Sequence, residues 1–242
     1  MSYVQRFKCR YVVLVSLVCF VILQALTSFC EEFIHKKYVD INQIRKDLST
    51  AYICEHYGIE ANSPAIIPKI IVVHWTGLDS FEGSYNSLKN PYLSSNRKDI
   101  SRGGPLNVCA HFLINQDGAV YQLLPPLYFA RHVIGLNYYA IGIENVGGLE
   151  KALSSKQLQS NEKLIRYLVA KYSTIEYVIG HYEYRLFEGT PLFLEKNQTY
   201  RNKKQDPGEN FMQSLRKNLG DLYNKSRLKS VTSITKKKGE SR

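Results

Sequence analysis

Cysteine is scarce in this sequence, with five copies in 242 residues, and they form no disulfide framework. No CxxC pair and no cysteine/histidine cluster with zinc-finger spacing occurs, which excludes a zinc-finger protein. Cys9 and Cys19 lie near the N-terminus, so Cys30, Cys54 and Cys109 remain. In an oxidising compartment Cys54 and Cys109 can pair, and as buried free thiols they fit equally well. The sequence alone does not decide between these two states.

A broad basic surface and internal repeats are also lacking, although the formal net charge is +11. Three positive charges precede residue 11 without any acid, and residues 216–242 carry nine Lys or Arg against Asp221 and Glu240. Residues 11–215 are therefore close to neutral, and we expect no nucleic-acid binding. A charged end that includes Lys236-Lys237-Lys238 is typical of a solvated, disordered segment. We therefore expect residues 216–242 to form a disordered basic tail.

The N-terminus carries a 19-residue apolar run, Tyr11 to Phe29, between a basic and an acidic flank. This order is typical of a signal peptide or an N-terminal membrane anchor. The run is long for a cleaved signal and just long enough to span a bilayer. Cleavage near Cys30 is one alternative, and lipidation of Cys30 is another that the preceding Phe29 fits poorly. In each case we expect residues 1–30 to direct export to the periplasm, cell envelope or extracellular space.

Hydrophobic periodicity predicts helices and strands in alternation after this leader. We expect helices at 41–57, 154–172 and 210–223, and strand-like runs at 70–74, 109–114, 119–124, 138–146 and 177–180. Asp40 is the expected cap of the first helix, and Ser154 with Gln157 fits a capping box. Residues 77–106 show no periodicity and are expected to form a long loop. The order of elements predicts one α/β domain with a central mixed sheet flanked by helices.

Two histidines follow strand-like runs. His74 ends the β-branched run that begins at Ile70, and His181 ends the run that begins at Tyr177. A single histidine at such a place more often packs in a core, but two at neighbouring strand ends can face one pocket. Asp206 adds a carboxylate on a later turn. Two imidazoles and one carboxylate are a suitable donor set for an open zinc site with water in the fourth place.

Six motifs in a fixed order indicate a family. They are Ile71-Val72-Val73-His74-Trp75-Thr76, Cys109-Ala110-His111-Phe112-Leu113-Ile114 with Asp117-Gly118, Arg131-His132-Val133-Ile134-Gly135, Ala140-Ile141-Gly142-Ile143-Glu144-Asn145, Gly180-His181 and Lys204-Gln205-Asp206-Pro207-Gly208. With them, residues 40–220 resemble the zinc-dependent N-acetylmuramoyl-L-alanine amidases of the type-2 (AmpD-like) family, which is related to the peptidoglycan recognition proteins. The resemblance implies an amidase core at 70–215, preceded by a helix and connector at 31–69.

The resemblance also implies the roles of five residues. His74, His181 and Asp206 match the zinc ligands, Glu144 the catalytic acid/base, and Lys204 the lysine that stabilises the oxyanion. The implied reaction is cleavage of the amide between N-acetylmuramic acid and L-alanine of the stem peptide. Elementary chemistry agrees, because zinc lowers the pKa of bound water to about 7 and a carboxylate must then move its proton. Without the resemblance, Glu144 also fits a charge that points to solvent from a half-buried strand.

The remaining assignments concern substrate and partners. The resemblance places His132 in the substrate groove, Trp75 fits either a groove wall or the core, and His111 is expected to be structural. His181 and Asp206 are 25 residues apart, farther than in compact family members, so residues 184–195 are expected to form a wall or lid over the site. We expect a monomer that acts on peptidoglycan or muropeptides and contacts the membrane only if its leader is retained or lipidated. A peptidoglycan-binding module without turnover, or a zinc hydrolase of another amide, are the alternatives.

Overall fold

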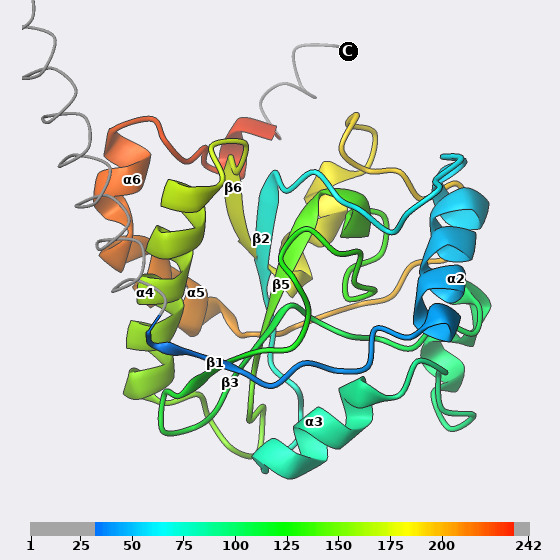
Figure 1. Cartoon of the computed structure of the whole chain (residues 1–242). Coiled ribbons are helices and arrows are strands. Elements are labelled where there is room, and N and C mark those ends of the chain that lie inside the picture. Colours follow the sequence, from blue (N-terminus) through cyan, green and yellow to red (C-terminus); the bar gives the residue numbers. More distant parts are fainter. Residues whose placement is uncertain (1–31, 235–242) are drawn as a thin grey trace, which may run out of the picture. The chain divides into compact units, whose positions relative to one another are not determined.

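The computed structural model describes residues 32–234 (Figure 1). The expected leader and the last residues of the expected tail, 235–242, lie outside the described residues. The chain divides into two units, Met1–His35 and Lys36–Arg242, and the second unit holds every element discussed below except the start of the first strand. Within residues 32–234, no helix is both long and apolar enough to cross a membrane.

A six-stranded mixed sheet forms the centre of the fold. Its strands are β1 (Ile34–Lys36), β2 (Ile70–Val73), β3 (Phe112–Ile114), β4 (Val120–Gln122), β5 (Ala140–Asn145) and β6 (Tyr177–Gly180), in the spatial order β1-β4-β3-β5-β2-β6. Strands β3, β5, β2 and β6 run parallel, and β4 is antiparallel to β3. The expected α/β class with a central mixed sheet is confirmed. The register sets Val73 opposite both Ile143 and Gly180, so three strands end at one edge.

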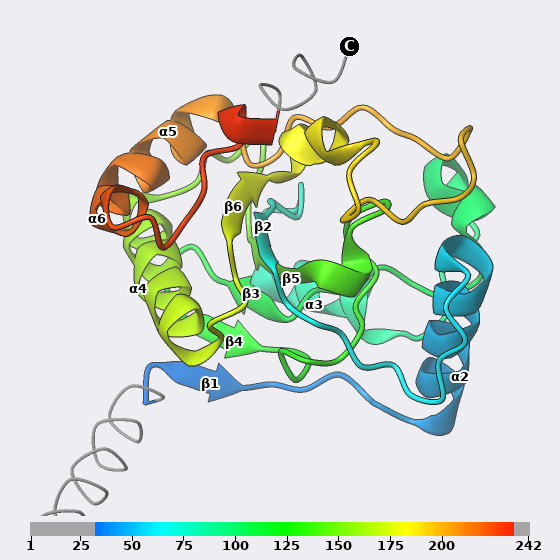
Figure 2. The ribbon, with the colours of Figure 1, turned by 90° about the horizontal axis from the view of Figure 1, so that it is seen from above.

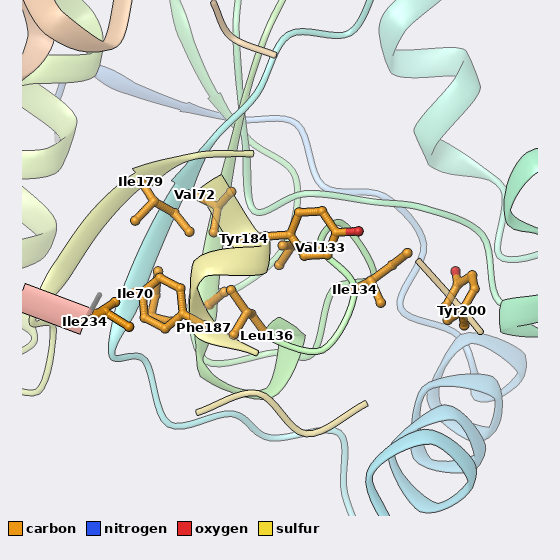
Figure 3. Close-up of a cluster of buried hydrophobic side chains, with 11 residues drawn as sticks. Ile70, Val72, Val133, Ile134, Leu136, Ile179, Tyr184, Phe187, Tyr200 and Ile234 are labelled. Carbon is orange, nitrogen blue, oxygen red and sulfur yellow. The ribbon is translucent and has the colours of Figure 1, made fainter. Parts of the chain in front are cut away.

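Helices cover the sheet. They are α2 (Gln43–Tyr52), α3 (Phe81–Lys89), α4 (Ser155–Lys171), α5 (Glu209–Asn218) and α6 (Gly220–Asn224). Helices α4, α5 and α6 lie on one side of the sheet, whereas α2 and the 3₁₀ segment His181–Phe187 lie on the other (Figure 2). Because side chains alternate along a strand, Ile70 and Val72 face this second side. Figure 3 shows them packed with Ile179, Val133 and Phe187 in one core cluster.

Several expected elements are confirmed. All four residues of β2 are buried, as the β-branched run predicted. The predicted hairpin forms between β3 and β4. The predicted capping box begins α4, where Ser154 Oγ accepts from the Gln157 backbone and Gln157 accepts from the Ser154 backbone. Cys54 and Cys109 are free thiols, Cys54 exposed and Cys109 buried, so they are not paired.

Two expectations about the first half of the chain are corrected. The N-cap of α2 is Asn42, whose side chain accepts from the Arg45 backbone, and not Asp40. The stretch 77–106 is not a continuous loop, because it contains α3 and a 3₁₀ turn at Lys98–Gly103. Ser80 caps α3, which buries only Ser84 and Leu88. A helix with so few buried positions leaves little hydrophobic periodicity in the sequence.

The expectation of a disordered tail from residue 216 is wrong for residues 216–234. Helix α5 continues to Asn218, α6 follows, and Leu219 and Leu228 are buried. The Arg227 guanidinium donates to four carbonyls near the end of α4, two of them those of Val169 and Tyr172. A cation at a helix C-terminus satisfies carbonyls that have no partner within the helix. Arg227, one of the positive charges from which a solvated tail was predicted, is therefore bound to the folded domain.

Candidate metal centre

Three predicted donors meet at the carboxyl edge of the sheet. His74 directly follows β2, and His181 directly follows β6. Because these strands are parallel neighbours with Val73 opposite Gly180, the two histidines leave the sheet side by side. Asp206 is brought to the same place by its turn, and its carbonyl accepts from the Tyr182 backbone. One donor atom from each of the three residues lies within 4.8 Å of the others.

The donor atoms are close together and shielded from solvent. His74 Nδ1 lies 2.9 Å from His181 Nδ1, and Asp206 Oδ2 lies 3.2 Å and 3.0 Å from these two nitrogens. The three residues are at most 8% exposed. Tetrahedral zinc with bonds of about 2.0–2.1 Å holds its ligands about 3.3 Å apart, so the spacing and the donor set both fit this ion.

The protonation states of the donors also suit a metal. Burial, reinforced by His181, lowers the pKa of His74 to about 4, so its imidazole is neutral at pH 7. Burial alone would raise the pKa of Asp206, but the charges and hydrogen bonds of His181 and His74 outweigh it and hold that pKa well below the usual range. Metal ligands must be deprotonated, and neutral imidazole and ionised carboxylate are the states that bind.

Glu144 lies on β5, on the same face as Ala140 and Gly142. Its Oε2 atom is buried and has no hydrogen-bond partner within residues 32–234. Burial raises the pKa of this carboxyl well above its ordinary value, and the negative charge of Asp206 raises it further, against the opposing effect of Lys204. A carboxyl with a raised pKa beside a metal-binding cluster is suited to accept and return a proton.

Lys204 is half-buried and lies beside the donors. It lines a cavity of about 40 Å³ together with His132 and His181. It also lines an open hollow of about 660 Å³ that reaches Trp75. Lys204 therefore lines both the buried cavity beside His181 and the open hollow at the surface. Its expected role, stabilising the oxyanion, stays a prediction.

The surface beside the metal cluster is hollowed on both sides of Trp75. The hollow of about 660 Å³ is lined by cationic and aromatic residues, among them Tyr182, Arg185, Lys203 and Lys204. A second hollow of about 670 Å³ is more apolar and includes Leu153, Leu158 and Phe211. Trp75 and Leu149 line both, and Leu149 is 69% exposed. Trp75 thus belongs to a groove wall, whereas Leu149 and Phe211 stand in no motif or spacing that would have identified them before the structure.

His132 is buried beside the metal cluster, where it contacts His74 and lines the small cavity shared with Lys204 and His181, and its expected contact with substrate stays a prediction. Its Nδ1 is 3.0 Å from His74 Nε2, and its Nε2 is 3.2 Å from the Ala140 carbonyl oxygen. The preceding Arg131 is buried and donates to the carbonyls of Gly104, Leu106 and Ile100, which draws this segment into the interior. His111 is structural, as expected: its Nε2 donates to Tyr128 and its Nδ1 accepts from Gly142.

The segment between His181 and Asp206 is a fixed wall. Tyr184 and Phe187 are buried in the core cluster of Figure 3. Farther along, the buried carboxylate of Glu195 binds His56 Nδ1 through both oxygens, at 3.0 Å and 2.9 Å. His56 belongs to the wide helical turn Ile53–Tyr57 that follows α2. Of the two alternatives left by the sequence, these contacts favour a wall over a movable lid.

Comparison with known proteins identifies the core. The family profile described as N-acetylmuramoyl-L-alanine amidase (Amidase_2) matches residues 61–209. No curated protein matches the sequence. Among solved structures, the amidase LysC from Clostridium intestinale URNW is 20% identical, with 77% of this chain and 97% of LysC covered and a TM-score of 0.47. An AmpD derivative is 19% identical (77% and 94% covered, TM-score 0.46), and peptidoglycan recognition protein LE bound to tracheal cytotoxin is 16% identical (69% and 89% covered, TM-score 0.45).

Proposed function

The chain belongs to the N-acetylmuramoyl-L-alanine amidase family, and from this we propose that it is a zinc-dependent, exported peptidoglycan amidase. Its reaction is hydrolysis of the amide between N-acetylmuramic acid and L-alanine of the stem peptide. The observation that carries the zinc assignment is the convergence of His74, His181 and Asp206, whose donor atoms lie within 4.8 Å of one another in a buried position. Zinc held there supplies a Lewis acid that makes bound water a nucleophile at neutral pH.

Glu144 and Lys204 perform the remaining chemistry. Glu144 accepts a proton from the attacking water and delivers it to the leaving nitrogen of L-alanine, and its raised pKa keeps it basic enough for the first step and acidic enough for the second. Lys204 faces the site from its half-buried position and stabilises the negative charge on the amide oxygen as water adds. Neither side chain belongs to the metal-binding group, so removing either leaves metal binding intact.

The substrate is a peptidoglycan strand or a muropeptide. Two open hollows on either side of Trp75 offer room for a sugar on one side of the scissile bond and a peptide on the other. The cationic side, with Arg185, Lys203 and Lys204, suits the carboxylates of a stem peptide. The recognition protein LE is bound to monomeric diaminopimelic acid-type peptidoglycan, which supports a ligand of this class.

The decisive experiment uses purified muropeptides and the chain from residue 32 onward, with and without a chelator. We expect mass spectrometry to find free stem peptide and free muramyl sugar only without chelator. Binding without cleavage would replace the proposal with the recognition-module alternative. Zinc content, measured by elemental analysis, should be about one ion per chain, and an active preparation without zinc would overturn the metal assignment.

Export is tested separately. The apolar run at 11–29 and its basic flank motivate the proposal. A reporter enzyme that works only outside the cytoplasm, fused after residue 40, should be active. The matched control replaces Arg6, Lys8 and Arg10 with acidic residues, which should greatly reduce reporter activity because the flanking charge directs insertion. Equal activity of both fusions would contradict this part of the proposal.

A further inference from the structure

We propose that His132 is a positioning residue that fixes the tautomer of His74, so that His74 presents the bare nitrogen Nδ1 to the metal. The inference rests on the proposed function, because it concerns how the chain binds the ion. His132 has no metal-ligating role itself: the group able to hold a metal consists of His74, His181 and Asp206. It acts only through His74.

The hydrogen bonds determine where each proton lies. The Ala140 carbonyl oxygen can only accept, so the Nε2 of His132, 3.2 Å away, carries a hydrogen. In a neutral imidazole the other nitrogen then has a lone pair, so His132 Nδ1 is an acceptor. His74 Nε2, 3.0 Å from it, must donate. The remaining nitrogen of His74, Nδ1, therefore has a free lone pair, and this atom faces His181 and Asp206.

The position of the His132 ring is specified by its surroundings. Gly142 lies next to it on β5, and a Cβ added there would stand 2.8 Å from His132 Cγ and 2.9 Å from its Nδ1. A residue other than glycine would therefore push the ring away. The backbone is held as well, because Asn137 Oδ1 accepts from the amides of His132 and Val133 at 2.9 Å and 2.7 Å. Asn137 in turn donates to the Tyr57 hydroxyl.

His111 provides an internal comparison. It is also a buried histidine with one ring nitrogen donating to a carbonyl and the other accepting. Its acceptor nitrogen, however, binds a backbone amide, whereas that of His132 binds a metal ligand. The two rings are in edge contact, with centroids 5.8 Å apart, but only His132 makes a hydrogen bond to a metal ligand. This pair separates positioning from general stability.

Two substitutions of His132 each keep only one of its two ring hydrogen bonds. In His132→Asn, the amide oxygen comes near the position of Nδ1 and can still accept from His74. In His132→Gln, the amide nitrogen comes near the position of Nε2 and still donates to Ala140, but the acceptor for His74 is lost. Outer partners of metal-binding histidines are typically worth roughly 10–100-fold in metal affinity. We expect that loss in His132→Gln and a loss of only about threefold or less in His132→Asn and in the control His111→Gln.

The measurement is the zinc dissociation constant at one pH, by competition with a chromophoric chelator, for variants whose fold is checked by circular dichroism. Equal affinities of His132→Gln and the wild type, or an equal loss in His111→Gln, would overturn the inference. If a variant does not fold, ¹⁵N NMR of the wild-type imidazoles decides: a proton on Nδ1 of His132 would overturn the inference, and protons on Nε2 of both His132 and His74 support it. Failure of wild-type zinc binding would instead overturn the proposed function, and the inference with it.

Discussion

Two places in this molecule bury histidine beside carboxylate, and they differ in how the charges are satisfied. At the wall, Glu195 uses both oxygens on a single imidazole, that of His56. At the metal centre, Asp206 faces two histidines whose ring nitrogens approach each other, and nearby Glu144 keeps one buried oxygen that has no partner in the described part of the chain. At the wall both carboxylate oxygens are satisfied, although His56 Nε2 is buried without a partner among the described residues. At the metal centre, by contrast, it is the anionic and lone-pair donors that converge on one point. The comparison indicates that the first site serves the fold and the second is arranged for a cation.

The largest difference between the two sites should appear on removal of a ligand. His74→Ala, His181→Ala or Asp206→Ala should lose both bound zinc and amidase activity, because three protein ligands are the minimum for such a centre. The matched change at the wall, His56→Ala, should leave about one zinc per folded chain. Elemental analysis and a muropeptide assay measure both. Zinc retained in Asp206→Ala would remove the distinction between the two sites.

Glu144→Gln should separate chemistry from metal binding. Glutamine keeps the size of the side chain but cannot accept a proton, and acid–base assistance is typically worth about 10²–10⁴-fold. We expect kcat to fall by this factor while zinc content and substrate affinity change little. Turnover close to wild type would show that Glu144 is only a strand residue. Glu183 and Glu209 would then be the next carboxylates to test.

Breaking the wall pair should reduce stability and leave zinc binding intact. Glu195→Ala leaves the buried His56 imidazole without its partner, and an unsatisfied buried polar group typically costs about 1–3 kcal/mol. The control is Glu188→Ala, whose half-buried carboxylate pairs with Arg185 and Arg201 near the surface, and whose loss should cost less than about 1 kcal/mol. Urea unfolding measures both. Equal losses for the two variants would mean that Glu195 contributes no more than a surface pair.

Lys204→Met should reduce kcat less than Glu144→Gln does, because zinc remains to stabilise the oxyanion. About 10-fold is the expected scale, with zinc content unchanged. Lys203→Met, in the same hollow, is the control for chemistry: it should change kcat by about twofold or less and raise KM instead, because Lys203 lies on the side proposed for the stem peptide. Loss of zinc in Lys204→Met would show that the lysine supports the metal centre instead of the reaction.

The smallest expected effect is on how the stability of the metal-free protein depends on pH. Burial, followed by the charge of Asp206, raises the pKa of Glu144 above its unfolded value. The folded chain therefore holds this proton to higher pH than the unfolded chain, and stability is lost as pH rises through the folded pKa. The metal-free Glu144→Gln variant has no proton to lose at this position. At pH 8 its free energy of unfolding should therefore exceed that of the wild type by about 1–3 kcal/mol, the usual cost of an unsatisfied buried polar group. Urea unfolding of the chelated proteins at pH 5 and pH 8 tests this, and an equal pH dependence in both would contradict it.

The sequence predicted what depends on local pattern. A β-branched run identified β2, and the residue after it identified His74, because strand ends are positions where side chains leave a sheet. Asp206 and Lys204 were found through a motif shared with a family. What depends on packing between distant segments was not found. The position of His132 next to His74 requires glycine at residue 142, because a Cβ there would meet the His132 ring. Arg227 is ordered because its guanidinium donates to carbonyls at the end of α4.

The parallel pairing of β2 with β6 has a consequence for how the enzyme gains and loses its ion. The His74 backbone donates to Ile143 and accepts from Asn145, His181 directly follows the last residue of β6, and the Asp206 carbonyl accepts from the Tyr182 backbone. The donors are thus held in place by the polypeptide itself, and loading requires no refolding. Exchange of the ion is then reversible: amidase activity removed by a chelator should return when zinc is added back, at the speed of ion entry and not of protein folding.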